Sequence, residues 1–331
     1  MLGKNKLFES SVFGPVPSRR LGISLGVDLV PAKVCTLDCI YCEAGRTNLQ
    51  TVQRKEYKDI SKVIMELGEV LSSKLYLDYV TFSGAGEPTL NSGIGRVVRF
   101  LKEKHPEYKV CLITNGTLLG DDQVIRDIQG IDLVIPSLDA ADEETYRKIN
   151  RPCEKRTCEN LIDGLVKFRK TSKTPFWLEI FVVPGLNDTE KSISAIRRAV
   201  ERIMPDKIQL NSLDRPGTEK TVEKADMASL KKIQDCLSGI ATVEIVGKFA
   251  LAKTPAVPGS DTEIGTKILD MISRRPCTVS DLAEAFGRPQ QEILDAVSRL
   301  VRENKAVAEE MARGIFYKLK HHVAQSSTDS K

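Results

Sequence analysis

The stretch Cys35-Thr36-Leu37-Asp38-Cys39-Ile40-Tyr41-Cys42 carries three cysteines in the spacing C-x3-C-x2-C. Thiolates on one short loop can ligate irons of a cubane [4Fe–4S] cluster, and complete ligation by the protein would need a fourth cysteine. An iron without a protein ligand keeps a position open for a small molecule, as a catalytic zinc with an incomplete protein ligand set does. The spacing therefore predicts a cluster with one open iron. A zinc site or a disulfide loop is the alternative that the spacing alone leaves open.

The same loop, with the aromatic Tyr41 just before its last cysteine, resembles the signature of the radical S-adenosylmethionine (SAM) superfamily. The resemblance implies that Cys35, Cys39 and Cys42 ligate a [4Fe–4S] cluster and that Tyr41 packs near the adenine of SAM. It also implies that the open iron binds the amino and carboxylate groups of SAM. An electron from the cluster then cleaves the sulfonium to a 5′-deoxyadenosyl radical, which abstracts hydrogen from a substrate. The electron would come from an external donor such as a flavodoxin or a ferredoxin.

The composition indicates a globular protein of a reducing compartment. The chain has 331 residues, of which 41% are hydrophobic, enough for one large domain and a small one. Its net charge of +4 is too balanced to indicate a nucleic-acid footprint. Eight cysteines with a ligand-like cluster favour metal binding over disulfides. Residues 1–10 lack the apolar core of a signal peptide, and no run of about 18 apolar residues occurs. We therefore expect a cytoplasmic protein that does not bind membranes.

Strand-like and helix-like patterns alternate along the first two thirds of the chain. Apolar runs predict six strands, at residues 23–30, 77–82, 109–114, 131–138, 176–183 and 207–211. Segments with helical periodicity separate the later strands, and this alternation favours parallel βα units. The resemblance implies an α/β fold of the open, partial (β/α)6 barrel type. Periodicity alone fits a doubly wound sheet equally well.

The C-terminal part of the chain has a different pattern. Residues 247–260 are rich in Pro and Gly and predict a linker after a barrel domain at 1–246, which includes an N-terminal extension. Residues 261–320 read as three helices followed by a hairpin, similar to a winged helix-turn-helix domain, and 321–331 as a flexible tail. Residues 261–331 contain 11 basic and 11 acidic side chains, whereas phosphate binding needs a basic face. Docking to protein, or dimerisation, is therefore as well supported as binding to RNA or DNA.

Reactive groups in βα barrels follow the carboxyl ends of the strands. After the second predicted strand, Gly84-Ala85-Gly86-Glu87-Pro88 resembles the Gly-Gly-Glu motif of the family. The resemblance implies that Gly86 and Glu87 bind the amino group of SAM, with Gly84 a weaker match. A backbone carbonyl and a carboxylate suit an ammonium group because both only accept hydrogen bonds.

The ends of the third and fourth predicted strands carry further polar residues. Thr114 and Asn115, and then Ser137 and Asp139, resemble the family's contacts to the ribose and the methionine carboxylate of SAM. A cap on the next helix is the alternative for Asp139. No residue is assigned a catalytic role.

Some polar residues have two readings. Glu179, Gln209 and Asn211 interrupt apolar strands and either face a barrel interior or point outward. Arg19 and Arg20 either meet an anionic ligand or are solvated charges near a turn. The other five cysteines lack a cluster spacing, so a second cluster is unsupported.

Four segments narrow the resemblance to Fe–S oxidoreductases that are distantly related to the tRNA wyosine-base synthases. They are GPVPSRRLGISLGVD at 14–28, RP at 151–152, VPGLND at 183–188 and QLNSLDRPGTE at 209–219. Those synthases carry a second cysteine set, which in the archaeal form lies upstream of the radical SAM loop. Because residues 1–34 contain no Cys, we do not assign the wyosine reaction, and tRNA remains only a candidate substrate.

Two functions from other classes stay open at this point. One is an Fe–S- or SAM-dependent redox sensor and DNA-binding regulator that acts through the winged helix. The other is a structural zinc protein. The enzyme is favoured because the cysteine motif and a matching Gly-Glu loop both fall at predicted strand ends.

Overall fold

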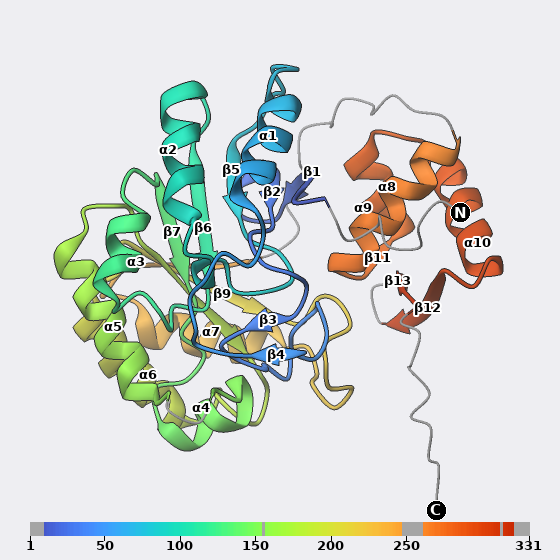
Figure 1. Cartoon of the computed structure of the whole chain (residues 1–331). Coiled ribbons are helices and arrows are strands. Elements are labelled where there is room, and N and C mark those ends of the chain that lie inside the picture. The colour runs from blue at the N-terminus through green and yellow to red at the C-terminus, as the bar shows by residue number, and fades with distance from the viewer. Residues whose placement is uncertain (1–9, 154–155, 247–260, 312–313, 321–331) are drawn as a thin grey trace, which may run out of the picture.

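The structure is a computed structural model that describes residues 10–153, 156–246, 261–311 and 314–320 (Figure 1). The predicted linker at 247–260 and tail at 321–331 lie outside the described residues. We call residues 10–246 the βα region and residues 261–320 the C-terminal region. Each helix that the structure describes is too short or too polar to cross a membrane.

One row of strands forms the centre of the βα region. The strands pair in the order β1-β2-β5-β6-β7 and β8-β9-β10, and parallel bridges from Val134 to Phe176 and from Ser137 to Glu179 join β7 to β8. Every pairing in the row is parallel except that of β1 with β2. The bounds are β1 Val12–Ser18, β2 Gly22–Val27, β5 Tyr79–Phe82, β6 Val110–Thr114, β7 Leu133–Pro136, β8 Trp177–Val182, β9 Lys207–Ser212 and β10 Thr242–Ile245. The spatial order follows the chain order, which is the order of a partial barrel and not of a doubly wound sheet.

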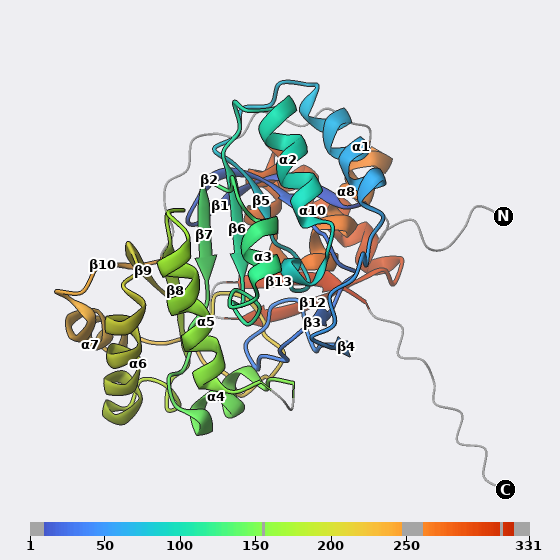
Figure 2. The ribbon, with the colours of Figure 1, turned by 60° about the vertical axis from the view of Figure 1, so that its left-hand side comes forward.

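Helices connect the parallel strands and cover the outer side of the row (Figures 1 and 2). They are α1 Ile60–Leu71, α2 Ile94–Lys104, α3 Asp122–Asp127, α4 Glu143–Asn150, α5 Cys158–Thr171, α6 Glu190–Ile203 and α7 Met227–Leu237. In α1 the buried residues Ile60, Val63, Leu67 and Leu71 recur at helical spacing. They join strand residues such as Val80 in one large hydrophobic core.

All six predicted strands of the βα region are confirmed, but the two edge strands of the row were not predicted. At one edge, β1 contains Pro15 and Pro17. Proline in a sheet is restricted to edge strands and bulges, so the sequence of this strand resembles a loop. At the other edge β10 has only four residues, none of them buried, so it gives little apolar signal.

The C-terminal region contains three helices and a three-stranded antiparallel sheet. The elements are α8 Asp261–Arg274, β11 Cys277–Thr278, α9 Val279–Phe286, α10 Gln290–Arg302, β12 Ala306–Met311 and β13 Gly314–Leu319. The sheet order is β11-β13-β12. Its core includes the fully buried Ile268, Leu282 and Val297. The predicted three helices and hairpin are therefore confirmed, whereas β11 was not predicted.

The two regions pack together through β1 and the end of α8. Val16 of β1 belongs to the hydrophobic core of the C-terminal region. Arg274 of α8 donates from Nε to Asp28 Oδ2 at 2.6 Å and from Nη2 to the Ser10 carbonyl at 3.0 Å. Its guanidinium also lies 4.6 Å from the centre of the Phe13 ring. The side chains of Arg274 and Asp28 are 9% and 8% exposed, so this ion pair is buried at the contact.

We expect Arg274→Ala to lower the free energy of unfolding by about 3–5 kcal/mol, because it leaves Asp28 buried without its cation. Urea unfolding followed by circular dichroism measures the loss. Arg302→Ala is the matched control, because Arg302 is exposed on α10 of the same region. Equal unfolding midpoints for Arg274→Ala and wild type would contradict the expectation.

Candidate functional site

The cysteine loop lies at the carboxyl end of the strand row. It begins at the short strand β3, Val34–Cys35, which pairs with β4, Leu49–Gln50. Within the loop the Cys42 amide donates to the Cys39 carbonyl at 3.2 Å. This backbone turn brings the last two cysteines onto one tight bend.

Each thiol of the loop meets a donor group from this chain. The contacts are Lys33 Nζ to Cys42 Sγ at 3.1 Å, Asn115 Nδ2 to Cys35 Sγ at 3.4 Å and Asn150 Nδ2 to Cys39 Sγ at 3.5 Å. Burial, followed by the charge of Glu87, raises the pKa of Cys35 to about 12. Burial also raises the pKa of Cys39 well above its usual range. Positively charged iron ions would stabilise the ionised thiolates of these cysteines, so the donor set fits an iron–sulfur cluster. No group of His, Cys, Asp and Glu side chains in the described residues is arranged to hold a single metal ion.

Glycines let the loop after β5 approach the cysteine loop. A Cβ at Gly86 would lie 2.4 Å from the Val34 carbonyl oxygen, to which the Glu87 amide donates at 3.0 Å. Gly84 has φ +137, and a Cβ there would lie 1.3 Å from Asp28 Oδ1. Both positions therefore require glycine for steric reasons.

The buried Glu87 joins the loops after β5 and β6. Its Oε1 accepts from the Thr89 amide at 3.1 Å, from Thr89 Oγ1 at 2.6 Å and from Thr114 Oγ1 at 2.7 Å. Its Oε2 accepts from the Asn115 amide at 2.8 Å. Burial raises the pKa of Glu87, whereas these hydrogen bonds lower it by a smaller amount. Thr114 and Glu87 thus already bind each other, and only Oε2 keeps capacity for a further donor.

Asn115 fastens the loop after β6 to the cysteine loop. In addition to Cys35, its Nδ2 donates to Thr36 Oγ1 at 2.8 Å, and its Oδ1 accepts from the Thr117 amide at 3.1 Å. Ser137 lies at the end of β7, where its amide donates to the Thr114 carbonyl at 3.0 Å. Its hydroxyl makes no hydrogen bond to another described residue.

Asp139 holds Tyr41 and the end of β8. It is 1% exposed and accepts from Tyr41 Oη at 2.5 Å, Asn150 Nδ2 at 2.6 Å and the Phe181 amide at 2.9 Å. The Tyr41 ring stacks on Phe181 with centroids 3.8 Å apart. The helix-cap alternative for Asp139 is wrong, because Asp142 caps α4. Asp139 instead positions the residue between two cysteines of the loop.

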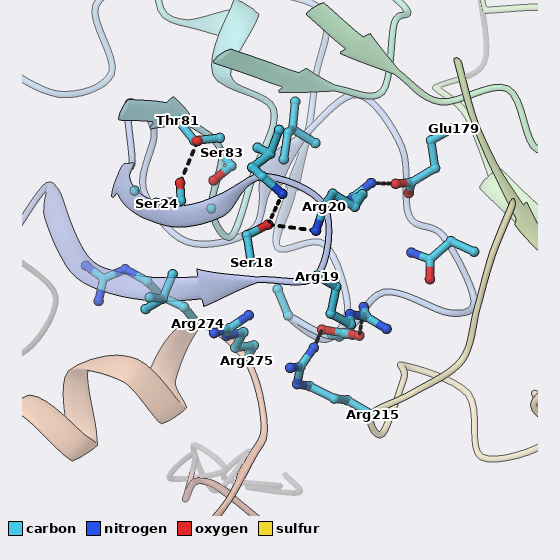
Figure 3. A pocket seen from close by; sticks show the side chains of 18 of the residues that line it. Ser18, Arg19, Arg20, Ser24, Thr81, Ser83, Glu179, Arg215, Arg274 and Arg275 are labelled. Atoms are coloured by element: carbon cyan, nitrogen blue, oxygen red, sulfur yellow. Dashed lines mark hydrogen bonds and ion pairs between the residues drawn. The ribbon is translucent and has the colours of Figure 1, made fainter. Parts of the chain in front are cut away.

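A pocket of about 340 Å³ opens beside the cysteine loop (Figure 3). Of the predicted site residues, Tyr41, Cys42 and Gly84 line it, whereas Glu87, Thr114, Asn115, Ser137 and Asp139 do not. Glu179 and Asn211 line it too, so the interior reading of these two residues is confirmed. The Oε1 atom of Gln209, one strand over from Glu179, is buried without a hydrogen-bond partner in the described chain.

Arginines dominate the charge of this pocket. The residues are Arg19, Arg20, Arg215, Arg274 and Arg275, against the carboxylates of Glu43 and Glu179. Arg20 forms an ion pair with Glu179, and the side chains of Arg19 and Arg20 are only 23% and 16% exposed. The solvated reading of these two arginines is therefore wrong. Burial, and then the charge of Arg19, lowers the pKa of Arg20 to about 10. None of Arg215, Arg274 and Arg275 was predicted: Arg215 lies in the segment at 209–219 that carries the resemblance but was given no role, and Arg274 and Arg275 look like ordinary charges at a helix end.

A family model for the radical SAM superfamily matches residues 29–195. The chain belongs to the radical SAM superfamily. It is therefore an enzyme of the family that uses a [4Fe–4S] cluster and SAM, and its reaction is unassigned.

Two relatives and a solved structure are similar to this chain. A UPF0026 protein of Methanocaldococcus jannaschii is 31% identical over 92% of this chain and 94% of its own length. A protein of Brachyspira hyodysenteriae named GTPase Obg is 32% identical over 94% of this chain, which spans only 45% of that relative. The crystal structure of a radical SAM methyltransferase from Sphaerobacter thermophilus has a TM-score of 0.54 at 16% identity, covering 67% of this chain and 65% of that one. This last likeness concerns the fold.

We expect Asp139→Asn to lower the free energy of unfolding of the metal-free protein by about 1–3 kcal/mol. Asp139 accepts from three donors, whereas an amide nitrogen would face one of them and leave it unpaired. Tyr41→Phe is the comparison variant, because it removes only one of these hydrogen bonds, and its loss should be smaller. Chemical denaturation measures both. A wild-type stability for Asp139→Asn would show that the three contacts do not hold the loop.

Proposed function

We propose that Cys35, Cys39 and Cys42 hold a [4Fe–4S] cluster and that the pocket beside them receives the substrate. The observation that carries the proposal is the position of the pocket, whose wall includes Tyr41 and Cys42 of the cysteine loop. Its volume of about 340 Å³ falls within the range of small-molecule sites. A substrate held there would lie directly against the loop.

The group to be bound supplies the difficult chemistry, and the chain supplies orientation. When bound, the cluster and SAM supply a 5′-deoxyadenosyl radical that abstracts a hydrogen atom from the substrate. Lys33, Asn115 and Asn150 donate to the sulfurs of the three cysteines and fix their directions. Asp139 and Phe181 fix the ring of Tyr41.

Some of the residues that the resemblance assigns to SAM remain proposed contacts, and the others are assigned to positioning. Glu87 Oε2 and the backbone at Gly84 and Gly86 remain proposed contacts of its amino group, because that oxygen accepts only one hydrogen bond in the structure. The Ser137 hydroxyl remains a proposed contact of the ribose or carboxylate. We assign Thr114, Asn115 and Asp139 to positioning, because their polar side-chain atoms already bind the chain.

We also propose that the C-terminal region is a winged helix-turn-helix domain with bounds 261–320. The order helix, strand, two helices and hairpin supports this assignment. Its contact with β1 and Asp28 favours a role in completing the enzyme. The alternative of a DNA-binding regulator is less favoured, because the net charge of residues 261–331 is zero.

The cellular context is a proposal as well. None of the eight cysteines, which all lie in the described residues, forms a disulfide, and this fits a reducing cytoplasm. An external donor such as a flavodoxin or a ferredoxin would supply the electron. tRNA stays a candidate substrate that no described contact supports.

We expect Cys39→Ala to lose both the reconstituted cluster and SAM cleavage, because an iron of the cluster would lack its thiolate. Anaerobic reconstitution with iron and sulfide, then dithionite and SAM, measures iron content, the visible spectrum and 5′-deoxyadenosine. Cys236→Ala is the matched control, because Cys236 lies on α7, outside the cysteine loop.

The outcomes separate the alternatives. An intact cluster with full SAM cleavage in Cys39→Ala would refute the ligand assignment. Wild-type protein that binds about one zinc and no iron would favour the structural zinc protein. A wild-type cluster that never cleaves SAM, together with duplex binding that follows the cluster's oxidation state, would favour the sensor.

A further inference from the structure

The arginines of the pocket differ in how completely their charges are neutralised. Arg20 is paired with Glu179. Arg274 is paired with Asp28 and Asp270, at 2.6 and 2.5 Å. These two cations are therefore fully matched by carboxylates of the chain.

The other three arginines share the carboxylates around them. Arg215 Nη1 lies 3.2 Å from Glu43 Oε2, and Arg19 Nη2 lies 3.9 Å from the other oxygen of the same carboxylate. Arg19 also lies 3.6 Å from Asp214. The Arg275 guanidinium makes no ion pair or hydrogen bond to any described residue. The carboxylates of Glu43 and Asp281 also act on Arg275 by their charge, but neither forms an ion pair with it.

The guanidinium groups of Arg215 and Arg275 are held away from bulk water. Arg215 is 5% exposed, and its Nε is a buried donor without a partner among the described residues. Arg275 is partly buried, and burial, followed by the charge of Arg215, lowers its pKa. Like charges at close range and an unmade buried hydrogen bond both cost free energy. An anion bound between the arginines would offset both costs.

The three arginines come from distant parts of the chain. Arg19 follows β1, Arg215 follows β9 and Arg275 follows α8 of the C-terminal region. In Figure 3 the side chains of Arg19, Arg215 and Arg275 lie on one side of the pocket, away from the Arg20–Glu179 pair. Arg275 also lines an adjoining pocket of about 290 Å³ between the two regions. The three arginines therefore lie where the proposed substrate pocket meets the contact between the βα region and the C-terminal region.

We propose that Arg19, Arg215 and Arg275 bind a phosphate group of the substrate, and that the C-terminal region completes this site by supplying Arg275. The proposal rests on the proposed function in taking this pocket as the substrate's. Phosphate suits the site better than carboxylate, because it offers more acceptor oxygens to guanidinium groups that donate in pairs. A small phosphorylated molecule suits it better than a nucleic acid, because the arginines line a confined pocket and the C-terminal region has no surplus of basic charge.

Isothermal titration of the cluster-loaded, full-length protein with inorganic phosphate tests the site. At a fixed pH of about 7.5 and fixed ionic strength, malonate is the comparison anion, because its charge is close to that of phosphate. We expect wild type to bind phosphate more tightly than malonate. We expect Arg275→Ala to weaken phosphate binding at least tenfold, as the loss of a charged hydrogen bond does.

Three further variants make the result specific. Arg275→Lys keeps the charge and should retain more affinity than Arg275→Ala. Arg215→Ala should weaken binding to a similar degree, with circular dichroism and the cluster spectrum checking that it folds. Arg302→Ala, which removes an exposed arginine of α10 outside the pocket, should bind phosphate as wild type does.

Several results would overturn the proposal. They are wild type that binds no phosphate, Arg275→Ala that binds it with unchanged affinity, and malonate that binds more tightly than phosphate. Binding of a tRNA mixture that depends on Arg275, without binding of phosphate, would replace the small molecule by a nucleic acid. Because the titration needs no SAM cleavage, the two proposals fail separately. Arg275-dependent phosphate binding in a protein that never cleaves SAM would leave the anion site standing.

Discussion

The buried carboxylate of Asp28 connects the three parts of this structure on which the site depends. It follows β2 and binds Arg274 of the C-terminal region through Oδ2. Through Oδ1 it accepts from the Ala85 amide at 3.2 Å, in the loop that follows β5. Gly84 makes this possible, because a Cβ there would occupy the position of the Asp28 oxygen. One charge therefore fixes both the docked C-terminal region and the loop that packs on the cysteines.

The cysteine loop is held by backbone as much as by side chains. The Lys33 amide donates to the Ala85 carbonyl at 2.7 Å, and the Glu87 amide donates to the Val34 carbonyl at 3.0 Å. Glu87 then joins this pair of segments to the loop after β6. Since each of these contacts comes from the carboxyl end of a neighbouring parallel strand, the strand order itself brings the site together. In the structure, Thr114, Asn115 and Asp139, which the resemblance implied as contacts of SAM, bind Glu87, Thr36 and Tyr41, respectively.

Contiguous signals made most of the fold predictable. Parallel strands are buried on both faces, so their apolar runs stand out in the sequence, and all six such runs are strands in the structure. The edges lack this signal, which explains why β1 and β10 were missed. The motif residues could be named for the same reason, because the cysteines and the Gly-Ala-Gly-Glu loop are continuous stretches. The readings of Arg20 and Glu179 stayed open because their partnership joins residues far apart in the chain.

Arg274 and Arg275 show most clearly why the remainder of the site could not be predicted. Adjacent arginines at the end of a helix are ordinary, because cations there interact favourably with the helix dipole. Docking of α8 separates their roles. Arg274 is held by Asp28 and Asp270 and fixes where the helix ends. Arg275 is thereby placed beside Arg215, and no described carboxylate forms an ion pair with it. The cost of holding two neighbouring guanidinium groups and the unpartnered Nε of Arg215 away from water is the physical reason to expect that an anionic ligand completes this contact.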